Sequence, residues 1–310
     1  MAAPRSFGAD DIEGLLANDD DALWEDVFAA AREVKRRYGK EAVLPRGLIE
    51  TSNVCGKDCL YCGIRKSNSR ISRYKLTEAV VHQCCDEARR RGYPAIALQA
   101  GELEGEENTL FYERILAKCH DLEVTLSLGE QTESVYRRWK EAGALRYLLR
   151  IETSNRELYE KLHPASCSFT RRVDCIRTLK KLGYVTGTGV MIGLPGQTLR
   201  DLANDIVFFG NEGVDMVGMG PYVPNPDTPL ANRICPTARR RLESALKMIA
   251  IARLYLHDIN IVAATALSAL DNESGSARGI AAGANVIMPD LTPSEYKANY
   301  DLYPGKAVAN

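Results

Sequence analysis

The sequence predicts an α/β fold, a (β/α)₈ TIM-type barrel over residues 41–310 that is preceded by a helical extension over residues 1–40. Short apolar runs, strand-like in length, alternate with amphipathic segments along most of the chain. There are eight such runs, and a segment able to form a helix follows each of them except the last. The length of 310 residues is ordinary for one barrel, so we predict a single domain with an N-terminal extension.

The individual elements follow from the periodicity in chain order. Residues 9–39 are predicted to be helical because Leu23, Val27 and Ala31 recur on one face of a 3.6-residue period. The strand-like runs span residues 47–52, 95–99, 124–128, 146–151, 185–192, 215–218, 260–264 and 285–288. Helical segments are predicted at 77–91, 107–119, 132–142, 170–182, 198–211 and 236–256, and the stretches 63–76 and 265–284 show no clear period. In such a barrel the loops that follow the carboxyl ends of the strands carry the chemistry.

Charge and composition exclude several classes of protein. Lys and Arg number 40 and Asp and Glu number 41, so the formal net charge of -1 provides no long-range attraction for nucleic acid or an anionic membrane. No apolar stretch approaches the roughly 20 residues of a membrane span, and residues 1–13 carry no signal-peptide pattern. We therefore expect a cytoplasmic protein, in which clustered cysteines indicate a metal and scattered ones indicate packing.

Three of the nine cysteines lie close together directly after the first predicted strand. Cys55, Cys59 and Cys62 fall within eight residues and can reach one metal centre. A cubane iron–sulfur cluster takes four ligands, so three local thiolates without an obvious fourth would leave one iron open to bind a substrate. The remaining cysteines are interpreted as packing residues, namely Cys84, Cys85, Cys119, Cys167, Cys175 and Cys235.

Zinc is the alternative metal for the same three cysteines. A zinc site would need a remote Cys or His as its fourth ligand, and such sites usually pair one CxxC with a second CxxC or with a His pair. The sequence contains no such second motif. Simple burial of the three thiols is a further alternative.

The spacing Cys-x₃-Cys-x₂-Cys, with the aromatic Tyr61 just before the last cysteine, resembles the radical S-adenosylmethionine (SAM) superfamily. The resemblance implies that Cys55, Cys59 and Cys62 bind a catalytic [4Fe–4S] cluster at the mouth of the barrel. It also implies that the amine and carboxylate of SAM chelate the open iron. One electron, from a donor such as flavodoxin or ferredoxin, would then cleave SAM to methionine and a 5′-deoxyadenosyl radical. The protein would hold the cofactor, exclude water and aim the radical.

Further stretches of the sequence narrow this resemblance to one family within the superfamily. They are the stretches 52–55, 98–102, 125–130, 147–153, 193–198, 215–218, 226–230, 283–289 and 302–306. Together and in this order they resemble the HydE family of [FeFe]-hydrogenase maturases, from about residue 10 to residue 310, with biotin synthase and methylornithine synthase as relatives. Two features depart from the family. Ile151 stands where its members commonly have His, and residues 306–310 lack the cysteines that many members carry near the C-terminus.

The resemblance implies a set of SAM-binding residues. The end of the second predicted strand would supply backbone acceptors for the methionyl amine. Glu152 would bind the ribose or the amine, and Arg172 would pair with the methionyl carboxylate. Arg150 shares a strand face with Glu152, so it would orient Glu152 or contact the cofactor; for both arginines an ion pair at the rim is the alternative. The implied set is Tyr61, Gln99, Ala100, Gly101, Glu102, Arg150, Glu152 and Arg172.

A second set is expected to line an inner cavity for the substrate. Two arginines and small hydroxyl side chains inside an apolar barrel would form an anion site, which suits a carboxylate or a cyanide. We expect Arg46 and Arg146 to face a substrate anion, because no acidic residue is in obvious register with both. A barrel core whose polar groups satisfy one another is the alternative. The set is Arg46, Thr125, Ser127, Arg146, Met216, Thr265, Met288 and Tyr303.

Three functions are compatible with these features. The leading hypothesis is HydE-like action on a cysteine-bound Fe(CO)₂(CN) precursor, made by a partner maturase, during assembly of the two-iron subsite of [FeFe]-hydrogenase. The second is a HydE-like paralogue that acts on an amino-acid-type substrate, as methylornithine synthase or biotin synthase does, and Ile151 favours it. The third is a non-catalytic zinc protein. The first two imply a small-molecule or organometallic substrate and no nucleic-acid partner.

Overall fold

The strands form a closed parallel sheet. They are β1 (Leu44–Ser52), β2 (Ala95–Ala100), β3 (Glu123–Ser127), β4 (Arg146–Leu148), β5 (Val185–Thr188), β6 (Met191–Ile192), β7 (Met216–Pro221), β8 (Asn260–Ala263) and β9 (Val286–Ile287). The computed structural model describes residues 7–306. Its sheet runs in the order β5-β4-β3-β2-β1-β9-β8-β7-β6, and β5 also pairs with β7, which closes the barrel. Because β5 and β6 belong to one apolar run, the barrel corresponds to the eight predicted runs and confirms the predicted fold class.

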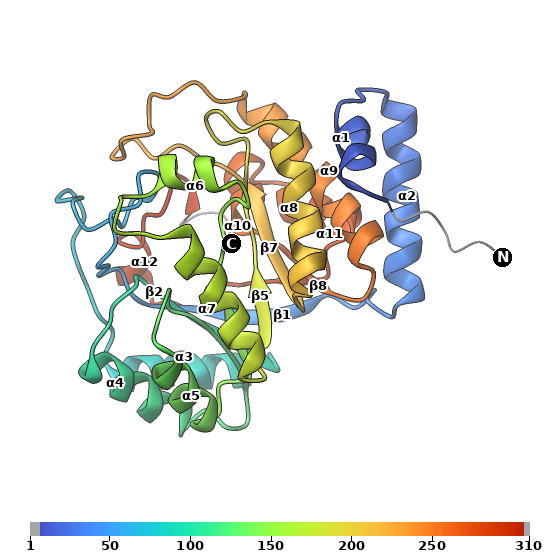
Figure 1. Cartoon of the computed structure of the whole chain (residues 1–310). Coiled ribbons are helices and arrows are strands. Elements are labelled where there is room, and N and C mark those ends of the chain that lie inside the picture. The colour runs from blue at the N-terminus through green and yellow to red at the C-terminus, as the bar shows by residue number, and fades with distance from the viewer. Residues whose placement is uncertain (1–6, 307–310) are drawn as a thin grey trace.

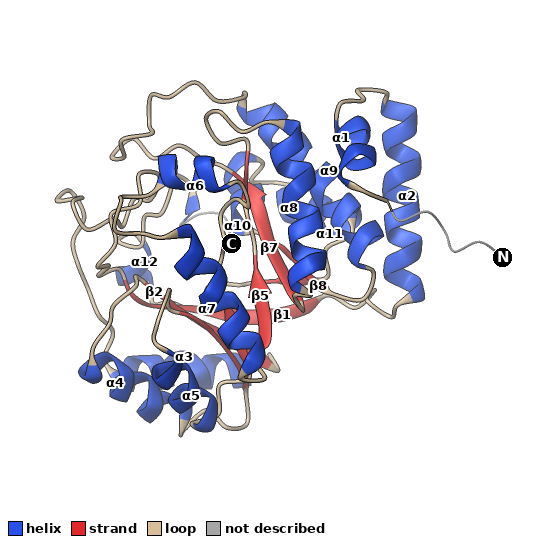
Figure 2. Cartoon of the chain, in the orientation of Figure 1, coloured by secondary structure: helices blue, strands red, loops and turns tan. Residues whose placement is uncertain are grey.

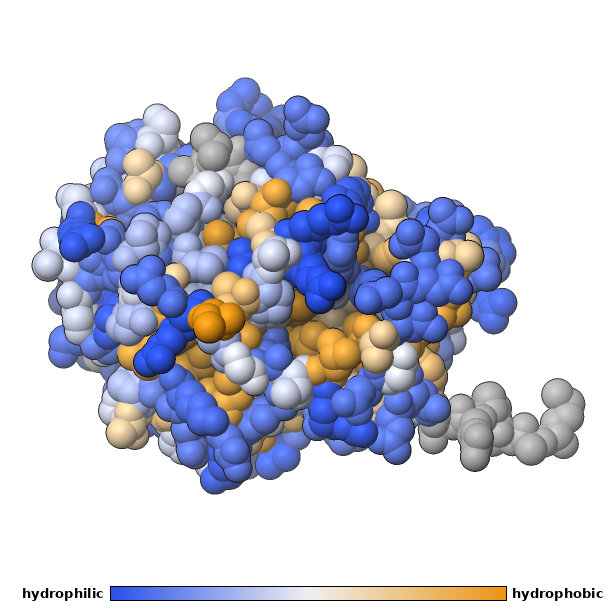
Figure 3. All heavy atoms as spheres, turned by 90° about the horizontal axis from the view of Figure 1, so that it is seen from above, coloured by the Kyte–Doolittle hydropathy of each residue, from blue (hydrophilic) through white to orange (hydrophobic). Residues whose placement is uncertain are grey.

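The helices surround this sheet, as Figure 2 shows. Among the described residues they are α1 (Ala9–Leu16), α2 (Asp21–Arg37), α3 (Glu78–Arg90), α4 (Glu106–Leu116), α5 (Glu133–Glu141), α6 (Arg156–Leu162), α7 (Phe169–Lys181), α8 (Leu199–Glu212), α9 (Ala238–Leu256), α10 (Thr265–Leu270), α11 (Gly275–Ala282) and α12 (Ser294–Lys297). The main apolar core lies between helices and sheet, where Ile49, Leu98 and Leu126 are fully buried. None of the helices in residues 7–306 is both long and apolar enough to cross a membrane, and hydrophilic residues cover most of the face in Figure 3.

The N-terminal extension forms two helices where the periodicity predicts one. The break lies at residues 17–20, where Asp20 accepts a hydrogen bond from the amide of Ala22 at 2.9 Å and so caps α2. A side chain that bonds the backbone in this way starts a new helix. α1 packs against α8 and α2 packs against α9, so the pair lies against the outer helices of the barrel (Figure 1).

The strand before Glu152 is shorter than predicted. β4 ends at Leu148, whereas the apolar run continues to Ile151. Beyond β4, the amide of Ile151 donates to the side-chain oxygen of Thr188 at 3.1 Å instead of to a backbone carbonyl. The regular ladder is therefore interrupted at Ile151, although the amides of Leu149 and Glu152 still donate to the carbonyls of Gly187 and Gly189. The stretch 265–284, which showed no clear period, contains α10 and α11, and α6 and α12 were also not predicted.

The register of the strands arranges the inward-facing side chains in layers. Ala97, Thr125 and Arg146 are paired across β2, β3 and β4. Two residues further along, Gln99 pairs with Ser127 and with Glu50 of β1. Because side chains alternate along a strand, both layers point into the barrel. The layer of Gln99 and Ser127 lies nearer the carboxyl ends of the strands, where the active site of such a barrel is expected.

Candidate active site

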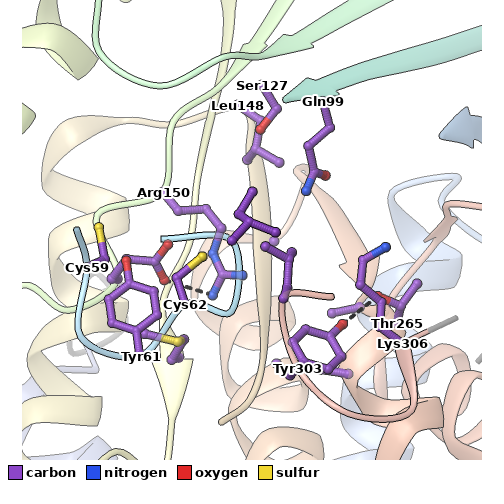
Figure 4. Close-up of a pocket in the computed structure, with 18 of the residues that line it drawn as sticks. Cys59, Tyr61, Cys62, Gln99, Ser127, Leu148, Arg150, Thr265, Tyr303 and Lys306 are labelled. Carbon is purple, nitrogen blue, oxygen red and sulfur yellow. Dashed lines mark hydrogen bonds and ion pairs between the residues drawn. The ribbon is translucent and has the colours of Figure 1, made fainter. Parts of the chain in front are cut away.

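A cavity of about 290 Å³ opens at the carboxyl ends of the strands. Figure 4 shows two groups of labelled residues that face one another across the pocket, with Gln99, Ser127 and Leu148 at a third edge. Cys59, Tyr61 and Cys62 lie on one side, and Tyr303 and Lys306 lie on the other. One side of the cavity is thus lined by thiols, and the opposite side is lined by hydroxyl and ammonium groups.

The cysteine side of the cavity is an irregular loop whose backbone carbonyls accept hydrogen bonds from one arginine. All three cysteines are free thiols and line the cavity. Arg73 donates to the carbonyl oxygens of Asn53 at 2.7 Å, Ile64 at 2.8 Å and Arg65 at 2.6 Å. A loop without helix or strand has few internal partners for its backbone groups. Arg73, which the sequence analysis did not identify, supplies them and so keeps the three sulfurs facing inward.

The thiols of this loop are poor acids on their own. Burial raises the pKa of Cys55 and raises that of Cys62 to about 12. A hydrogen bond with Cys167, followed by burial, raises the pKa of Cys59 well above its ordinary value. In such buried surroundings a thiol loses its proton when a cation binds the sulfur, because the cation stabilises the thiolate. Cys167, interpreted above as a packing residue, lies beside a cluster cysteine.

The end of β2 lies directly against the cysteine loop. The amide of Gly101 donates to the carbonyl of Ser52 at 2.9 Å. A Cβ at Gly101 would clash with the carbonyl oxygen of Val54 and would lie 2.7 Å from the Cβ of Cys55. Glycine is required here by close approach. Residues 99–102 all line the cavity that Cys55 also lines.

Glu152 is held in a strained conformation at the cavity wall. Its φ of 68° lies in the left-handed region, which is uncommon for a residue other than glycine. Its amide donates to Gly189 at 2.9 Å and its carbonyl accepts from Met191 at 3.0 Å, so the backbone is held on both sides. Its buried Oε2 lies 3.1 Å from Nη2 of Arg150, an ion pair whose geometry does not meet that of a hydrogen bond. A carboxylate oxygen has more than one lone pair, so Glu152 can still accept from a ligand in the cavity that it lines.

Arg172 is buried in α7 and is already bonded to protein groups. Its Nε donates to Glu130 at 2.6 Å, and its Nη1 donates to the carbonyl of Arg150 at 2.6 Å. The other oxygen of Glu130 lies 3.3 Å from Arg171 and 3.8 Å from Lys57. Arg172 lines the cavity, so these contacts orient it toward the space beside the cysteines. The sequence analysis did not identify Glu130 or Lys57.

Comparison with known proteins assigns the family. Residues 49–209 match the model of the Radical SAM superfamily, and this stretch contains the cysteine loop, the end of β2 and Glu152. The chain belongs to the radical SAM superfamily. It is 43% identical to the [FeFe] hydrogenase maturase subunit HydE of Thermotoga maritima over 97% of this chain and 85% of that protein. It is 29% identical to 3-methylornithine synthase of Methanosarcina acetivorans, over 94% of this chain and 83% of that protein.

The same fold is found in a solved structure of methylornithine synthase. That structure matches with a TM-score of 0.82 at 24% identity, covering 92% of this chain and 83% of that one. The likeness shows the shared barrel. The family match and the 43% identity to HydE confirm that this is a radical SAM enzyme related to HydE, so the hypothesis of a non-catalytic zinc protein is wrong.

The residues present fit the cofactors that radical SAM enzymes use, a [4Fe–4S] cluster and SAM. Three free thiols face one cavity from a loop that a single arginine holds in place. Gly101 keeps the wall beside Cys55 free of a side chain. Glu152 lines the same cavity and presents a carboxylate that Arg150 contacts at 3.1 Å.

The eight expected substrate residues lie at two depths. Those that line the cavity are Ser127, Thr265, Met288 and Tyr303. Those that lie outside its lining are Arg46, Thr125, Arg146 and Met216. The structure therefore brings only half of the set to the cavity wall. Thr125 and Arg146 are paired one layer closer to the amino ends of the strands than Ser127.

Arg146 has an acidic partner that the sequence did not indicate, although this partner does not pair with Arg46 as well. Glu123, at the start of β3, places its Oε2 2.6 Å from Nη1 of Arg146 and is itself half exposed. It reaches Arg146 from the amino-terminal rim, because it lies on the same strand face two residues before Thr125. Arg46 contacts the sulfur of Met216 at 2.6 Å, and burial together with the charge of Arg146 lowers the pKa of Arg46 to about 10.

Lys306 of the cavity wall and its buried ion-pair partner Glu50 were not identified from the sequence. Lys306 lines the wall opposite the cysteines, and its ammonium pairs with the fully buried Glu50 of β1. Burial raises the pKa of Glu50 to about 7, with Lys306 opposing the rise. The inward position of Glu50 on its strand, two residues from Leu48 of the cavity lining, was the available signal.

Proposed function

We propose that this radical SAM enzyme acts in [FeFe]-hydrogenase maturation, in assembly of the two-iron subsite on a cysteine-bound Fe(CO)₂(CN) precursor. The observation that carries the proposal is the 43% identity to the maturase HydE over 97% of the chain. The identity to 3-methylornithine synthase is lower, at 29% over 94% of the chain. The two relatives are covered to nearly the same extent, so the difference in identity favours the maturase.

The chain has residues that would bind each part of the two cofactors. Cys55, Cys59 and Cys62 would bind the cluster, residues 99–102 would accept from the methionyl amine, and Glu152 would accept from the ribose. Once bound, the cluster and SAM supply a 5′-deoxyadenosyl radical to the cavity. Arg172, oriented by its bond to Glu130 at 2.6 Å, would face the methionyl carboxylate. Arg150 would position Glu152, which it contacts at 3.1 Å.

The far side of the cavity supports a small anionic substrate. Leu148, Val262 and Met288 form an apolar wall that excludes water. Beyond this wall, Thr125 Oγ1 and Arg146 Nε are buried and make no hydrogen bond within residues 7–306. Donors in a low-dielectric site are costly unless an acceptor reaches them. We propose that the substrate lies in the cavity on the near side of this wall, beside Ser127 and Thr265, and that the charge of Arg146 acts on its anionic ligands or carboxylate from beyond the wall, with Arg46 and Met216 behind it.

The partners and the location form part of the same proposal. A one-electron donor such as flavodoxin or ferredoxin would reduce the cluster, and partner hydrogenase maturases would supply the iron precursor. We place the enzyme in the cytoplasm, as the sequence analysis expects, where such donors are kept reduced.

A second candidate is a paralogue that acts on an amino-acid-type substrate. The similarity to 3-methylornithine synthase favours it. The substitution of Ile151 for the family's histidine was the other argument for it. Ile151 is fully buried in the core between sheet and helices and is not part of the cavity lining. The substitution therefore changes no group that faces the cofactor or the substrate in this structure.

Anaerobic turnover distinguishes the two candidates. The reconstituted enzyme is given dithionite, SAM and either a synthetic cysteine-bound Fe(CO)₂(CN) complex or a panel of free amino acids. We expect the iron complex to be consumed and to increase formation of 5′-deoxyadenosine, and the amino acids to leave the background rate unchanged. Consumption of an amino acid with the iron complex left intact would establish the paralogue instead.

A variant pair tests the inner layer in the same assay. Arg146→Leu should keep the cluster and uncoupled SAM cleavage but lose product formation. Glu123→Gln is the matched control, because it removes only the rim carboxylate that lies 2.6 Å from Arg146. Full product formation by Arg146→Leu would contradict the role proposed for Arg146.

A further inference from the structure

Two cysteines and a histidine converge on the outer side of the barrel, away from the active site. His82 and Cys85 are three residues apart on α3 and therefore share a helix face. Cys119 follows α4, which packs against α3 (Figure 1). A ring nitrogen of His82 and the sulfurs of both cysteines all lie within 4.8 Å of one another. None of the three lines the active-site cavity, so the proposed function leaves them without a role.

The two sulfurs are enclosed and close, but they are not bonded. Cys85 and Cys119 are 0% and 1% exposed, and their sulfurs lie 3.2 Å apart. A disulfide would require about 2.05 Å. A tetrahedral zinc with Zn–S bonds of about 2.3 Å would hold them about 3.8 Å apart. The pair is therefore nearer to the separation of two zinc ligands than to that of a disulfide.

His82 distinguishes a metal site from a disulfide as the role of the cysteine pair. Nε2 of His82 is buried and makes no hydrogen bond with any residue that the structure describes. A buried nitrogen without a partner costs free energy. A disulfide between Cys85 and Cys119 would leave that cost in place. A metal held by both sulfurs and the imidazole would remove it.

The charges around the cluster permit a cation. Arg89, on the last turn of α3, approaches Cys119. It donates to Asp121 at 2.7 and 2.6 Å and to Asp86 at 2.7 Å. Two carboxylates thus compensate its positive charge before it meets the cysteines. Two thiolates would in turn compensate a divalent ion, so the occupied site would carry no net charge in a half-buried position.

We propose that His82, Cys85 and Cys119 form a zinc site, with water in the fourth tetrahedral position. Two thiolates and an imidazole are a ligand set that suits Zn²⁺, whereas Mg²⁺ and Ca²⁺ take oxygen ligands. His82 is the partly exposed member, so the ion enters from its side. Bound zinc would join α3 to the segment between α4 and β3 on the outer wall of the barrel.

Zinc analysis of the holoenzyme tests the site. The cluster is first reconstituted so that iron occupies the active-site cysteines, zinc sulfate is added, and excess metal is removed by gel filtration. We expect about one zinc per chain in the parent and in Cys84→Ser, and less than about 0.1 in His82→Gln and Cys119→Ser. Cys84 is the matched control because it is buried on the same helix but lies outside the cluster. Iron should stay at about four per chain in all four proteins.

A second measurement identifies the atoms that bind the zinc. Zinc-edge X-ray absorption of the parent should show sulfur ligands at about 2.3 Å and nitrogen at about 2.0 Å. A parent that binds no zinc, or a His82→Gln variant that binds as much as the parent, would overturn the proposal. So would a Cys85–Cys119 disulfide found by intact mass in the anaerobically prepared holoenzyme. If Cys119→Ser fails to fold, His82→Gln decides, because its side chain is partly exposed and of similar size.

Discussion

Removing the positive charge of Lys306 should destabilise the protein in a way that depends on pH. Lys306 pairs with Glu50, and their side chains are 6% and 0% exposed. Burial raises the pKa of Glu50 from 4.5 to about 7 even with Lys306 beside it. At 1.36 kcal/mol per pKa unit, that shift costs about 3.4 kcal/mol once the pH exceeds the folded value. The folded state holds this proton more tightly than the unfolded state, so the contribution of Glu50 to stability is fully present below pH 4.5 and is lost as the pH rises through about 7.

The variant Lys306→Met removes the group that opposes the rise in the pKa of Glu50. Breaking a buried ion pair by removing one partner costs about 3–5 kcal/mol. For a chain of this size, each kcal/mol lowers the melting temperature by about 2 °C. Glu50 can avoid most of that cost by binding a proton, which at pH 8 costs about 1.4 kcal/mol more than in the parent, whose Glu50 has a pKa of about 7. Together with about 1 kcal/mol for the lost hydrogen bond, we expect a loss of about 5 °C at pH 8. At pH 5 Glu50 is protonated in the folded state, and the loss should be about 1 kcal/mol for one hydrogen bond.

Thermal unfolding of the reconstituted enzyme between pH 5 and 8 measures this difference. The double variant Lys306→Met with Glu50→Gln is the control, because a neutral amide replaces the carboxylate at nearly the same volume. It should recover most of the loss at pH 8 and change little at pH 5. An equal loss at both pH values, or no recovery in the double variant, would refute the assignment of the effect to the charge of Glu50.

Three further predictions concern the cofactor side of the cavity. Replacing any one of the three cluster cysteines by Ala should abolish the approximately four irons per chain and the brown absorbance, while Cys167→Ala should retain both; iron lost with Cys167→Ala would contradict the three-cysteine assignment. Glu152→Ala should weaken SAM binding by about 10- to 150-fold, the equivalent of about 1.5–3 kcal/mol, in equilibrium dialysis, and unchanged affinity would remove Glu152 from the SAM site. Gly101→Ala should lower cluster content measured by iron analysis, because the added Cβ would lie 2.7 Å from that of Cys55; a full complement of iron would show that the loop gives way without cost.

The active-site loop shows what local sequence determines well. Cys55, Cys59 and Cys62 act together because they lie within eight residues after a strand, and a spacing of that kind survives whatever the rest of the fold does. The alternation of apolar runs and amphipathic segments is also local, so it predicted the barrel. The end of β4 was less predictable. A side-chain oxygen of Thr188, more than thirty residues away, replaces the backbone partner of Ile151 and ends the strand early.

The depth of side chains in the barrel could not be predicted from their strand face. The alternation of side chains correctly placed Thr125, Ser127 and Arg146 toward the interior. It does not say how far along the axis a residue lies, because the register between neighbouring strands sets that height. The pairing of Thr125 with Arg146 places both below Ser127, within reach of Glu123 at the opposite rim.

The sequence by itself determined the order of the barrel, the cluster loop and the family of this enzyme. Only the tertiary structure decided which distant groups meet. Glu50 and Lys306 are 256 residues apart, and His82 and Cys85 of α3 meet Cys119 of the segment that follows α4. Periodicity and motif spacing describe neighbours along the chain. Contacts between distant segments arise when the sheet closes and the helices pack on it. The sequence around each residue carries no pattern that indicates which distant residue it will meet.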